Sequence, residues 1–315
     1  MTFDKMIATR DGFGDEIVEL GKENKNVLVV DADIGKSCKT GAFRKELPEQ
    51  YLNVGIAEQN CAGVAAGLAT CGKIPFVVTY AAFGSMRMCE MIRQEACYPN
   101  LNVKVACSHG GVTPANDGAS HQAIEDLGIY RSIPNMTVIM PADYWSTRKL
   151  VRAAAEVHGP VYLRFTRDKV PVIYDENTEF VIGKANRLRE GKDVAIIANG
   201  DTVRLAIQAA EELEAQGITA RVLDMHTIKP LDVEAVKAAA KDCGAVVTAE
   251  EHSIYNGLGS AVAEVLADGM NVPFERVGIM DRFGQSGKPA KLFEVYGLTD
   301  KEIFEAAERV IARKA

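Results

Sequence analysis

Short β-rich runs alternate with helical stretches along almost the whole chain, and this alternation limits the fold more than any other feature. Strands are predicted at six places in the first part of the chain: residues 26–31, 51–55, 75–80, 103–108, 137–140 and 161–165. Helical patterns fall between them, near residues 12–23, 57–72, 84–97, 122–129 and 143–157. Such an order is typical of parallel sheets covered by helices, so we expect an α/β fold.

The alternation is interrupted from residue 168 to 190, where proline and charged residues gather and only a weak strand at 180–182 is predicted. A second, smaller series follows, with strands at 194–198, 220–224, 245–249 and near 276–278, and helices near 202–215, 232–241, 259–267 and 299–313. We therefore predict two domains, residues 1–170 and 191–315, joined by a linker at 171–190. A length of 315 residues suits two domains of roughly 100–200 residues each.

Composition excludes several classes of protein. Hydrophobic residues make up 47% and charged residues 25%, with a mean hydropathy of −0.04, as in a water-soluble globular protein. A net charge of −7 argues against a nucleic-acid surface, and no apolar run is long enough to cross a membrane. The charged residues between positions 4 and 16 do not resemble a secretory signal, so we expect a cytoplasmic protein. The seven cysteines lack a Cys-x-x-Cys pair, and we assign no metal ligand to this chain.

The run Gly55-Ile56-Ala57-Glu58-Gln59-Asn60 ends a predicted strand and opens a helix of small residues. A helix of this kind can pack closely on a neighbour and leave Glu58 with little water around it. A carboxylate is costly to bury without a partner, which suggests a functional group. The simpler interpretation is an acidic first-turn residue stabilised by the helix dipole, and on its own the run fits that interpretation better.

Two further segments follow the ends of predicted strands, where open parallel sheets place their ligands. Tyr80 and Phe83 could supply a flat wall for an aromatic ring, or could be core residues. The polar loop 108–122 carries His109, Asp117 and His121 and is too long for a plain connection. Its composition favours a functional loop in which histidine acts as an acid, a base or a hydroxyl ligand near neutral pH.

These segments resemble the pyrimidine-binding domain of transketolase. The resemblance rests on residues 55–60, 80–87 and 108–125, with the core Asp-Gly-x-Ser-His-Gln-x-Ile-Glu at 117–125, and on residues 131–136 and 141–143. From about residue 190 onward the chain is similar to the transketolase C-terminal domain, including Glu250-Glu251-His252 and Gly257-Leu258-Gly259-Ser260. The resemblance therefore covers essentially the entire chain.

The resemblance implies roles for individual residues. Glu58 matches the catalytic glutamate that hydrogen-bonds the pyrimidine ring of thiamine diphosphate, and Phe83 matches the aromatic residue that stacks on that ring. Tyr80 stands where a second aromatic residue is usual, while Met86 replaces a frequent tyrosine. Asp117 and His121 match residues that contact the hydroxyl and carbonyl groups of the sugar. The group that binds the sugar phosphate is matched by Arg10, Ser37, His109 and Arg167. Asp33 matches an aspartate near the cofactor thiazole. Guanidinium groups suit a phosphate because they bind it in a bidentate way.

One expected signature is missing. A full-length transketolase begins with a diphosphate-binding domain that carries a Gly-Asp-Gly motif and a downstream asparagine for the metal, and this sequence contains no Gly-Asp-Gly. The resemblance therefore implies the C-terminal subunit of a split transketolase. Its partner would be an N-terminal subunit that supplies most of the ligands for Mg²⁺ or Ca²⁺, in an α2β2 heterotetramer.

The implied activity is transfer of a two-carbon ketol unit from a ketose phosphate to an aldose phosphate, as in the pentose phosphate pathway. Three alternatives stay open. Two are thiamine enzymes of the same architecture, a deoxyxylulose-phosphate synthase and the β subunit of a 2-oxo-acid dehydrogenase. The third is a non-catalytic assembly subunit, against which Glu58 and Phe83 argue.

Overall fold

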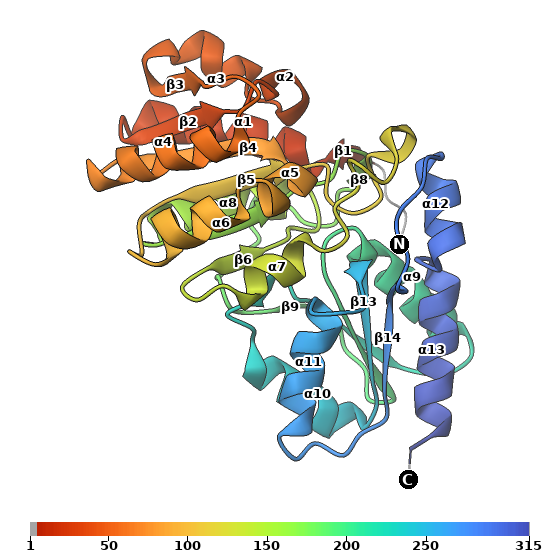
Figure 1. Ribbon diagram of the computed structural model, residues 1–315. Helices are drawn as coiled ribbons and strands as arrows, with labels where there is room; N and C mark the ends of the chain where they lie inside the picture. Colours follow the sequence, from red (N-terminus) through yellow and green to blue (C-terminus); the bar gives the residue numbers. More distant parts are fainter. Residues whose placement is uncertain (1–4, 315) are drawn as a thin grey trace.

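The computed structural model describes residues 5–314, and within this range the chain forms two α/β units that lie against each other (Figure 1). Each unit is built on a mainly parallel sheet with helices on both faces, so the expected fold class is confirmed. Residues 1–4 and 315, at the outer ends of the two expected domains, lie outside the described residues.

A seven-stranded sheet in the order β12-β6-β7-β5-β4-β2-β3 forms the centre of the first unit. Its six parallel strands are β2 (Val27–Asp31), β3 (Tyr51–Asn53), β4 (Ile74–Tyr80), β5 (Lys104–Ser108), β6 (Thr137–Ile139) and β7 (Val161–Arg164). All residues of β2, β5 and β7 are buried, as expected of central strands covered on both faces. The six strands predicted from the sequence are confirmed.

Helices cover both faces of this sheet. One face packs against α1 (Thr9–Glu23) and α8 (Tyr144–Glu156), and the other against α4 (Glu58–Thr70), α5 (Ala81–Met86), α6 (Cys89–Met91) and α7 (Asp126–Ser132). The single helix predicted at 84–97 is divided into α5, α6 and the π-helical segment η2 (Ile92–Cys97). The short helices α2 (Gly35–Cys38), α3 (Gly41–Glu46) and η1 (Pro48–Gln50) were not predicted.

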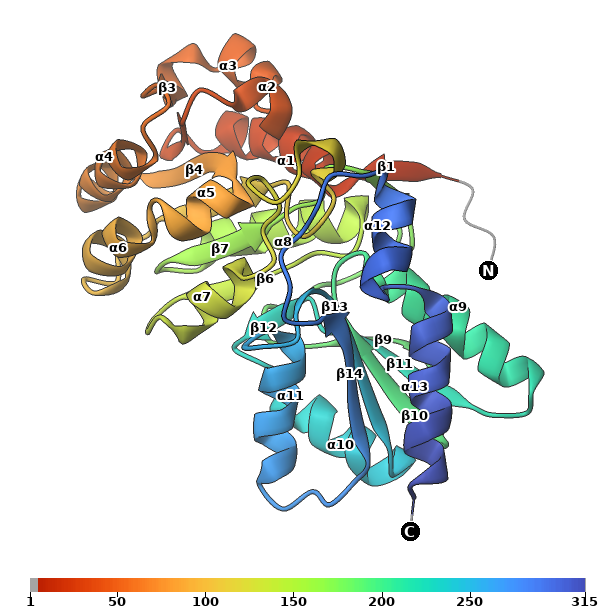
Figure 2. The same cartoon turned by 45° about the vertical axis from the view of Figure 1, so that its right-hand side comes forward.

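The second unit has a five-stranded sheet in the order β14-β13-β10-β11-β9. Its strands are β9 (Asn186–Arg189), β10 (Val194–Ala198), β11 (Ala220–Asp224), β13 (Val246–Ser253) and β14 (Phe274–Ile279), with β9 antiparallel at the edge. Figure 2 shows α9 (Thr202–Ala215) and α13 (Asp300–Ala312) on one face, with α10 (Val233–Cys243) and α11 (Leu258–Ala267) on the other. Helix α12 (Pro289–Tyr296), which was not predicted, lies beside the first unit.

The stretch between the units contributes strands to the structure. β8 (Lys169–Pro171) pairs antiparallel with β1 (Met6–Ala8), and β9 completes the second sheet. The strand predicted at 180–182 is wrong, because these residues pair with no strand. Phe180 instead packs its ring against Tyr174 and His226, at centroid distances of 4.8 and 5.5 Å. Side-chain packing, not strand pairing, therefore explains the apolar side chain of Phe180.

The two units share a core and hydrogen bonds. β12 (Thr227–Lys229) leaves the second unit and adds an antiparallel strand to β6 of the first. The carboxylate of Asp143, at the start of α8, accepts the backbone N–H groups of Ile173 and Tyr174, each at 2.8 Å. The Tyr174 hydroxyl donates to Asp224 of β11 at 2.8 Å. These contacts fix the second unit against the strand ends of the first.

Candidate active site

The candidate site lies beyond the carboxyl ends of β4, β5 and β7. Tyr80, the last residue of β4, is in register with Ser108, the last residue of β5. His109 comes directly after Ser108 and therefore lies close to Tyr80. Arg167 comes three residues after β7. The parallel sheet thus places predicted residues from distant parts of the sequence at one edge, as expected for this type of fold.

Glu58 is the first residue of α4 and is 6% exposed. The residue before it, Ala57, cannot cap the helix with its side chain, so the first turn keeps free N–H groups and a partial positive charge. The Glu58 carboxylate accepts a hydrogen bond from Arg87 at 2.8 Å. The predicted buried glutamate at a helix start is therefore present, with a cationic partner.

Arg87 is a site residue that the sequence reasoning missed. Its guanidinium carbon lies 4.0 Å from the centre of the Phe83 ring, while one of its nitrogens contacts Glu58. Phe83 and Arg87 are four residues apart at the end of α5, a spacing that puts two side chains on the same helix face. That spacing could have revealed the stacking, but the ion pair with Glu58 depends on the tertiary fold.

Four aromatic or imidazole rings form a wall next to Glu58. The Tyr80 ring is 3.8 Å from that of His109 and 5.9 Å from that of Phe83, measured between centroids. The His121 ring is 5.2 Å from Phe83 and 6.0 Å from Tyr80, in edge-on contact. The structure therefore brings together the predicted residues Tyr80, Phe83, His109 and His121.

His109 is held firmly in this wall. It is 2% exposed, and its backbone has a φ of +65°, which costs free energy for a residue with a side chain. Its Nδ1 lies 2.7 Å from the Ser108 hydroxyl, which in turn lies 3.1 Å from the buried thiol of Cys38. Ser108 and Cys38 were not singled out from the sequence. Their chain of polar contacts orients the His109 ring.

The predicted phosphate-binding residues partly come together. Burial, together with the nearby charges of Arg10 and Arg167, lowers the pKa of His109 to about 3. Arg10 donates from Nη1 to the carbonyl of Ser37 at 2.9 Å, so Ser37 takes part through its backbone and not its hydroxyl. Arg167 donates to the Pro114 carbonyl at 3.0 Å. Two guanidinium groups thus lie near a neutral imidazole.

Asp117 and Asp33 lie apart from these contacts. Asp117 is exposed on the loop, at the end of a short helical turn, η3 (Ala115–Asp117). Asp33 has a φ of +64° and accepts a hydrogen bond from Asn53 at 2.8 Å. It lines a cavity of about 500 Å³ with Asp11 and Tyr51, and the residues lining this cavity do not include those of the aromatic wall.

No group of three or more His, Cys, Asp or Glu side chains in residues 5–314 is arranged to hold a metal ion. No helix in the same range is both long and apolar enough to span a membrane.

Comparison with known families agrees with this geometry. Residues 5–172 match the model of the transketolase pyrimidine-binding domain, and residues 183–303 match that of the transketolase C-terminal domain. Two α/β domains of this kind form about the C-terminal half of a full-length transketolase, since 98% of this chain matches 49% of the length of human transketolase. The chain belongs to the transketolase family.

Individual relatives include separate transketolase subunits. A putative transketolase C-terminal section from Methanocaldococcus jannaschii is 48% identical, over 93% of each chain. A 6-deoxy-6-sulfo-D-fructose transketolase subunit from Clostridium sp. is 45% identical, over 97% of this chain and 95% of that protein. A solved structure described as a split-gene transketolase, an inactive β4 tetramer, is 48% identical with a TM-score of 0.90, over 99% of this chain and all of that one.

The environment of His109 predicts its charge. Because its pKa is lowered to about 3, the imidazole stays neutral in the folded protein throughout pH 5–8. Its NMR ring-proton signal, assigned by the loss of that signal in His109→Gln, should therefore not shift over this range. In protein unfolded with urea the same signal should titrate near the ordinary value of about 6.5. A folded-state midpoint above pH 5 would contradict the buried, neutral ring.

Proposed function

We propose that this chain is the C-terminal subunit of a split transketolase that moves a two-carbon ketol unit between a ketose phosphate and an aldose phosphate. It would act in cytoplasmic carbohydrate metabolism with thiamine diphosphate as cofactor. A partner subunit would contribute the diphosphate- and metal-binding domain, with Mg²⁺ or Ca²⁺, in an α2β2 assembly. The observation that supports this most is the Glu58 carboxylate, buried at the start of α4 and facing the same guanidinium that stacks on Phe83.

The contacts of Glu58 and Phe83 fit the aminopyrimidine ring of the cofactor. The Arg87 guanidinium, which is flat and carries N–H donors, already makes one hydrogen bond to Glu58 and lies on the face of Phe83. An aminopyrimidine is also flat and can receive a hydrogen bond from, or give one to, the same carboxyl group. When bound, thiamine diphosphate supplies the carbon nucleophile that the side chains of proteins lack. Glu58 would hold or move a proton at the pyrimidine ring nitrogen.

The remaining residues would bind the sugar. Arg10 and Arg167 would bind its terminal anionic group, with neutral His109 as a hydrogen-bond partner and Ser37 holding Arg10. Asp117 and His121 would contact the hydroxyl and carbonyl groups. The sulfonated sugar named for the Clostridium relative also ends in a tetrahedral anion, so the same arginines suit either group.

Asp33 would approach the thiazole side of the cofactor from its neighbouring cavity, and Tyr80 would extend the aromatic wall around the pyrimidine. The other thiamine enzymes are less favoured, because the two relatives of the highest identity described above are transketolase sections or subunits over nearly their full length. A non-catalytic subunit would not need a buried carboxylate beside a stacking surface.

Reconstitution tests the proposed function. We expect the purified chain alone to show no transketolase activity and to bind thiamine diphosphate weakly, because half of the cofactor site would belong to the partner. Mixing it with the diphosphate-binding subunit from the same organism should restore activity, measured with a ketose phosphate donor and an aldose phosphate acceptor. Full activity of the chain alone would contradict the split-enzyme proposal, and efficient turnover of pyruvate would favour the alternatives.

Glu58 can be tested without changing its size. In the assembled enzyme, Glu58→Gln should lower kcat by about a hundredfold or more, since general acid–base catalysis contributes roughly 10²–10⁴-fold. Assembly, followed by analytical ultracentrifugation, should be unchanged. Glu212→Gln, at an exposed position of α9, is the matched control and should retain parent activity. Normal turnover by Glu58→Gln would remove Glu58 from the mechanism.

The arginines can be tested by comparing two donors. Arg10→Ala and Arg167→Ala should each raise KM for a phosphorylated donor about tenfold to a hundredfold, because each removes a charge-assisted hydrogen bond of about 1.5–3 kcal/mol. Hydroxypyruvate has no phosphate, so its KM should change little. Arg187→Ala, an exposed arginine paired with Glu190, serves as the control. Equal effects on both donors would indicate a role in folding or cofactor binding instead.

A further inference from the structure

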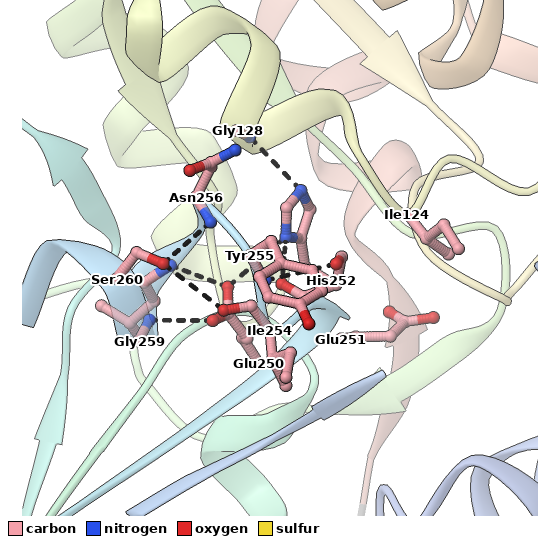
Figure 3. A network of polar contacts seen from close by, with 12 residues as sticks. Ile124, Gly128, Glu250, Glu251, His252, Ile254, Tyr255, Asn256, Gly259 and Ser260 are labelled. Carbon is pink, nitrogen blue, oxygen red and sulfur yellow. Dashed lines mark hydrogen bonds and ion pairs between the residues drawn. The ribbon is translucent and has the colours of Figure 1, made fainter. Parts of the chain in front are cut away.

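Three successive polar residues, Glu250, Glu251 and His252, lie fully buried at the carboxyl end of β13. Neighbouring side chains of a strand point to opposite faces, so Glu251 points away from the other two. Figure 3 shows this arrangement: Glu250 and His252 belong to one network, while the Glu251 carboxyl group lies outside it, on the side of Ile124.

The contacts of Glu250 and His252 account for their burial. Glu250 accepts the N–H groups of Leu258 and Gly259, at 2.7 and 2.8 Å, and so satisfies the first turn of α11. His252 Nδ1 donates to a backbone carbonyl, and its Nε2 accepts the N–H of Gly128 at 3.3 Å. These two residues thus stabilise helix ends and need no further role.

Glu251 has a different partner. Its Oε1 accepts a hydrogen bond from the backbone N–H of Val112 at 2.7 Å. Val112 belongs to the long loop of the first domain. Gly111 next to it has a φ of +65°, and a Cβ there would lie 2.2 Å from the Glu251 carboxyl carbon. The absence of a side chain at residue 111 therefore allows the close approach. Val112 is three residues from His109 and five from Asp117.

The surroundings of Glu251 make it a neutral hydrogen-bonding group. Burial raises its pKa to about 8, and the nearby cation of Arg164 only partly opposes this effect, while Asp201 adds to it. The second carboxyl oxygen, Oε2, has no hydrogen-bond partner among the described residues. A buried acid of this kind is costly to retain unless its contact with Val112 matters.

Other parts of the second domain hold the same loop further along. The Gln285 carbonyl accepts a hydrogen bond from the Gln122 side chain at 3.0 Å, and the Ser253 N–H donates to the Ile124 carbonyl at 2.8 Å. A Cβ at Gly118 would lie 2.6 Å from the Ser286 hydroxyl. The loop is thus fixed by the second domain near its beginning, its middle and its end.

We propose that Glu251 is a positioning residue through which the second domain fixes the loop 109–122 in the conformation that presents His109, Asp117 and His121 to the sugar. The inference rests on the proposed function insofar as the loop binds substrate. It assigns the C-terminal domain a part in the active site, through the position of this loop.

Hydrogen exchange of the isolated full-length chain tests the positioning directly and needs no activity. In Glu251→Ala, amides of the peptide 109–122 should exchange about tenfold to a hundredfold faster, since a buried N–H loses its partner. Glu251→Gln keeps an acceptor oxygen and should exchange like the parent. Glu250→Ala is the control: it should speed exchange at residues 258–259 and leave the loop unchanged. Parent-like exchange of the loop in a folded Glu251→Ala would overturn the proposal.

Kinetics of the assembled enzyme test the consequence for the sugar. Glu251→Ala should lower kcat/KM by about tenfold to a hundredfold, as small displacements of binding groups do. Its Kd for thiamine diphosphate, measured by fluorescence titration, should change much less than kcat/KM, because the contacts proposed for His109, Asp117 and His121 are with the sugar. Glu251→Gln should keep most of the kcat/KM of the parent. Faster exchange with unchanged kcat/KM would overturn the role in catalysis.

A second variant decides the matter if Glu251→Ala does not fold. Gly111→Ala forces the loop away from the same carboxyl group, so exchange in 109–122 should again rise while the rest of the chain stays protected. Unchanged exchange in that variant would overturn the proposal. If the unsubstituted chain assembled with its partner subunit showed no transketolase activity, the proposed function would be refuted. The exchange results would still decide whether Glu251 positions the loop.

Discussion

The buried guanidinium of Arg164 has to be neutralised at the point where the two domains meet. Burying a cation without partners costs of the order of several kcal/mol. Its Nε is 3.3 Å from Asp126, and its Nη2 donates to the carbonyls of Ala123 and Glu251, at 3.2 and 2.8 Å. Gly110 leaves room for it, since a Cβ there would lie 2.0 Å from Nε. The domain arrangement and the path of the site loop both depend on satisfying this cation.

The two sheets use their carboxyl ends differently. In the first domain these strand ends carry the aromatic wall around His109. In the second they face the first domain, and their polar residues are buried: Asp224 accepts a hydrogen bond from Tyr174, and Glu251 accepts one from Val112. A parallel sheet usually binds its ligands there. In the second domain, the sheet edge where ligands usually bind is therefore occupied by the first domain. This explains why the buried polar residues at that edge make contacts within the chain.

Local sequence was sufficient for some features and not for others. The strands of the first sheet could be predicted because buried parallel strands are short apolar runs, and Glu58 because a helix of small residues follows it. The edge strand β12 and the pairing of Glu58 with Arg87 could not, since each depends on segments far apart in sequence. The strand predicted at 180–182 is wrong for the same reason, because contacts with segments far away in the sequence decide its structure. Phe180 is apolar because its ring packs on other rings, not because the segment pairs with a strand.

If this chain holds half of a cofactor site, as we propose, the pairing of Arg87 with Glu58 bears on how the chain can exist alone. A buried carboxylate needs a partner, and Arg87 provides one while it covers Phe83. The Arg87 side chain is 52% exposed, so its guanidinium can return to water when another group takes its place beside Glu58. If thiamine diphosphate takes these contacts, as we propose, Arg87 must release both. An exposed arginine is suited to this exchange, since it satisfies Glu58 before assembly and returns to water afterwards.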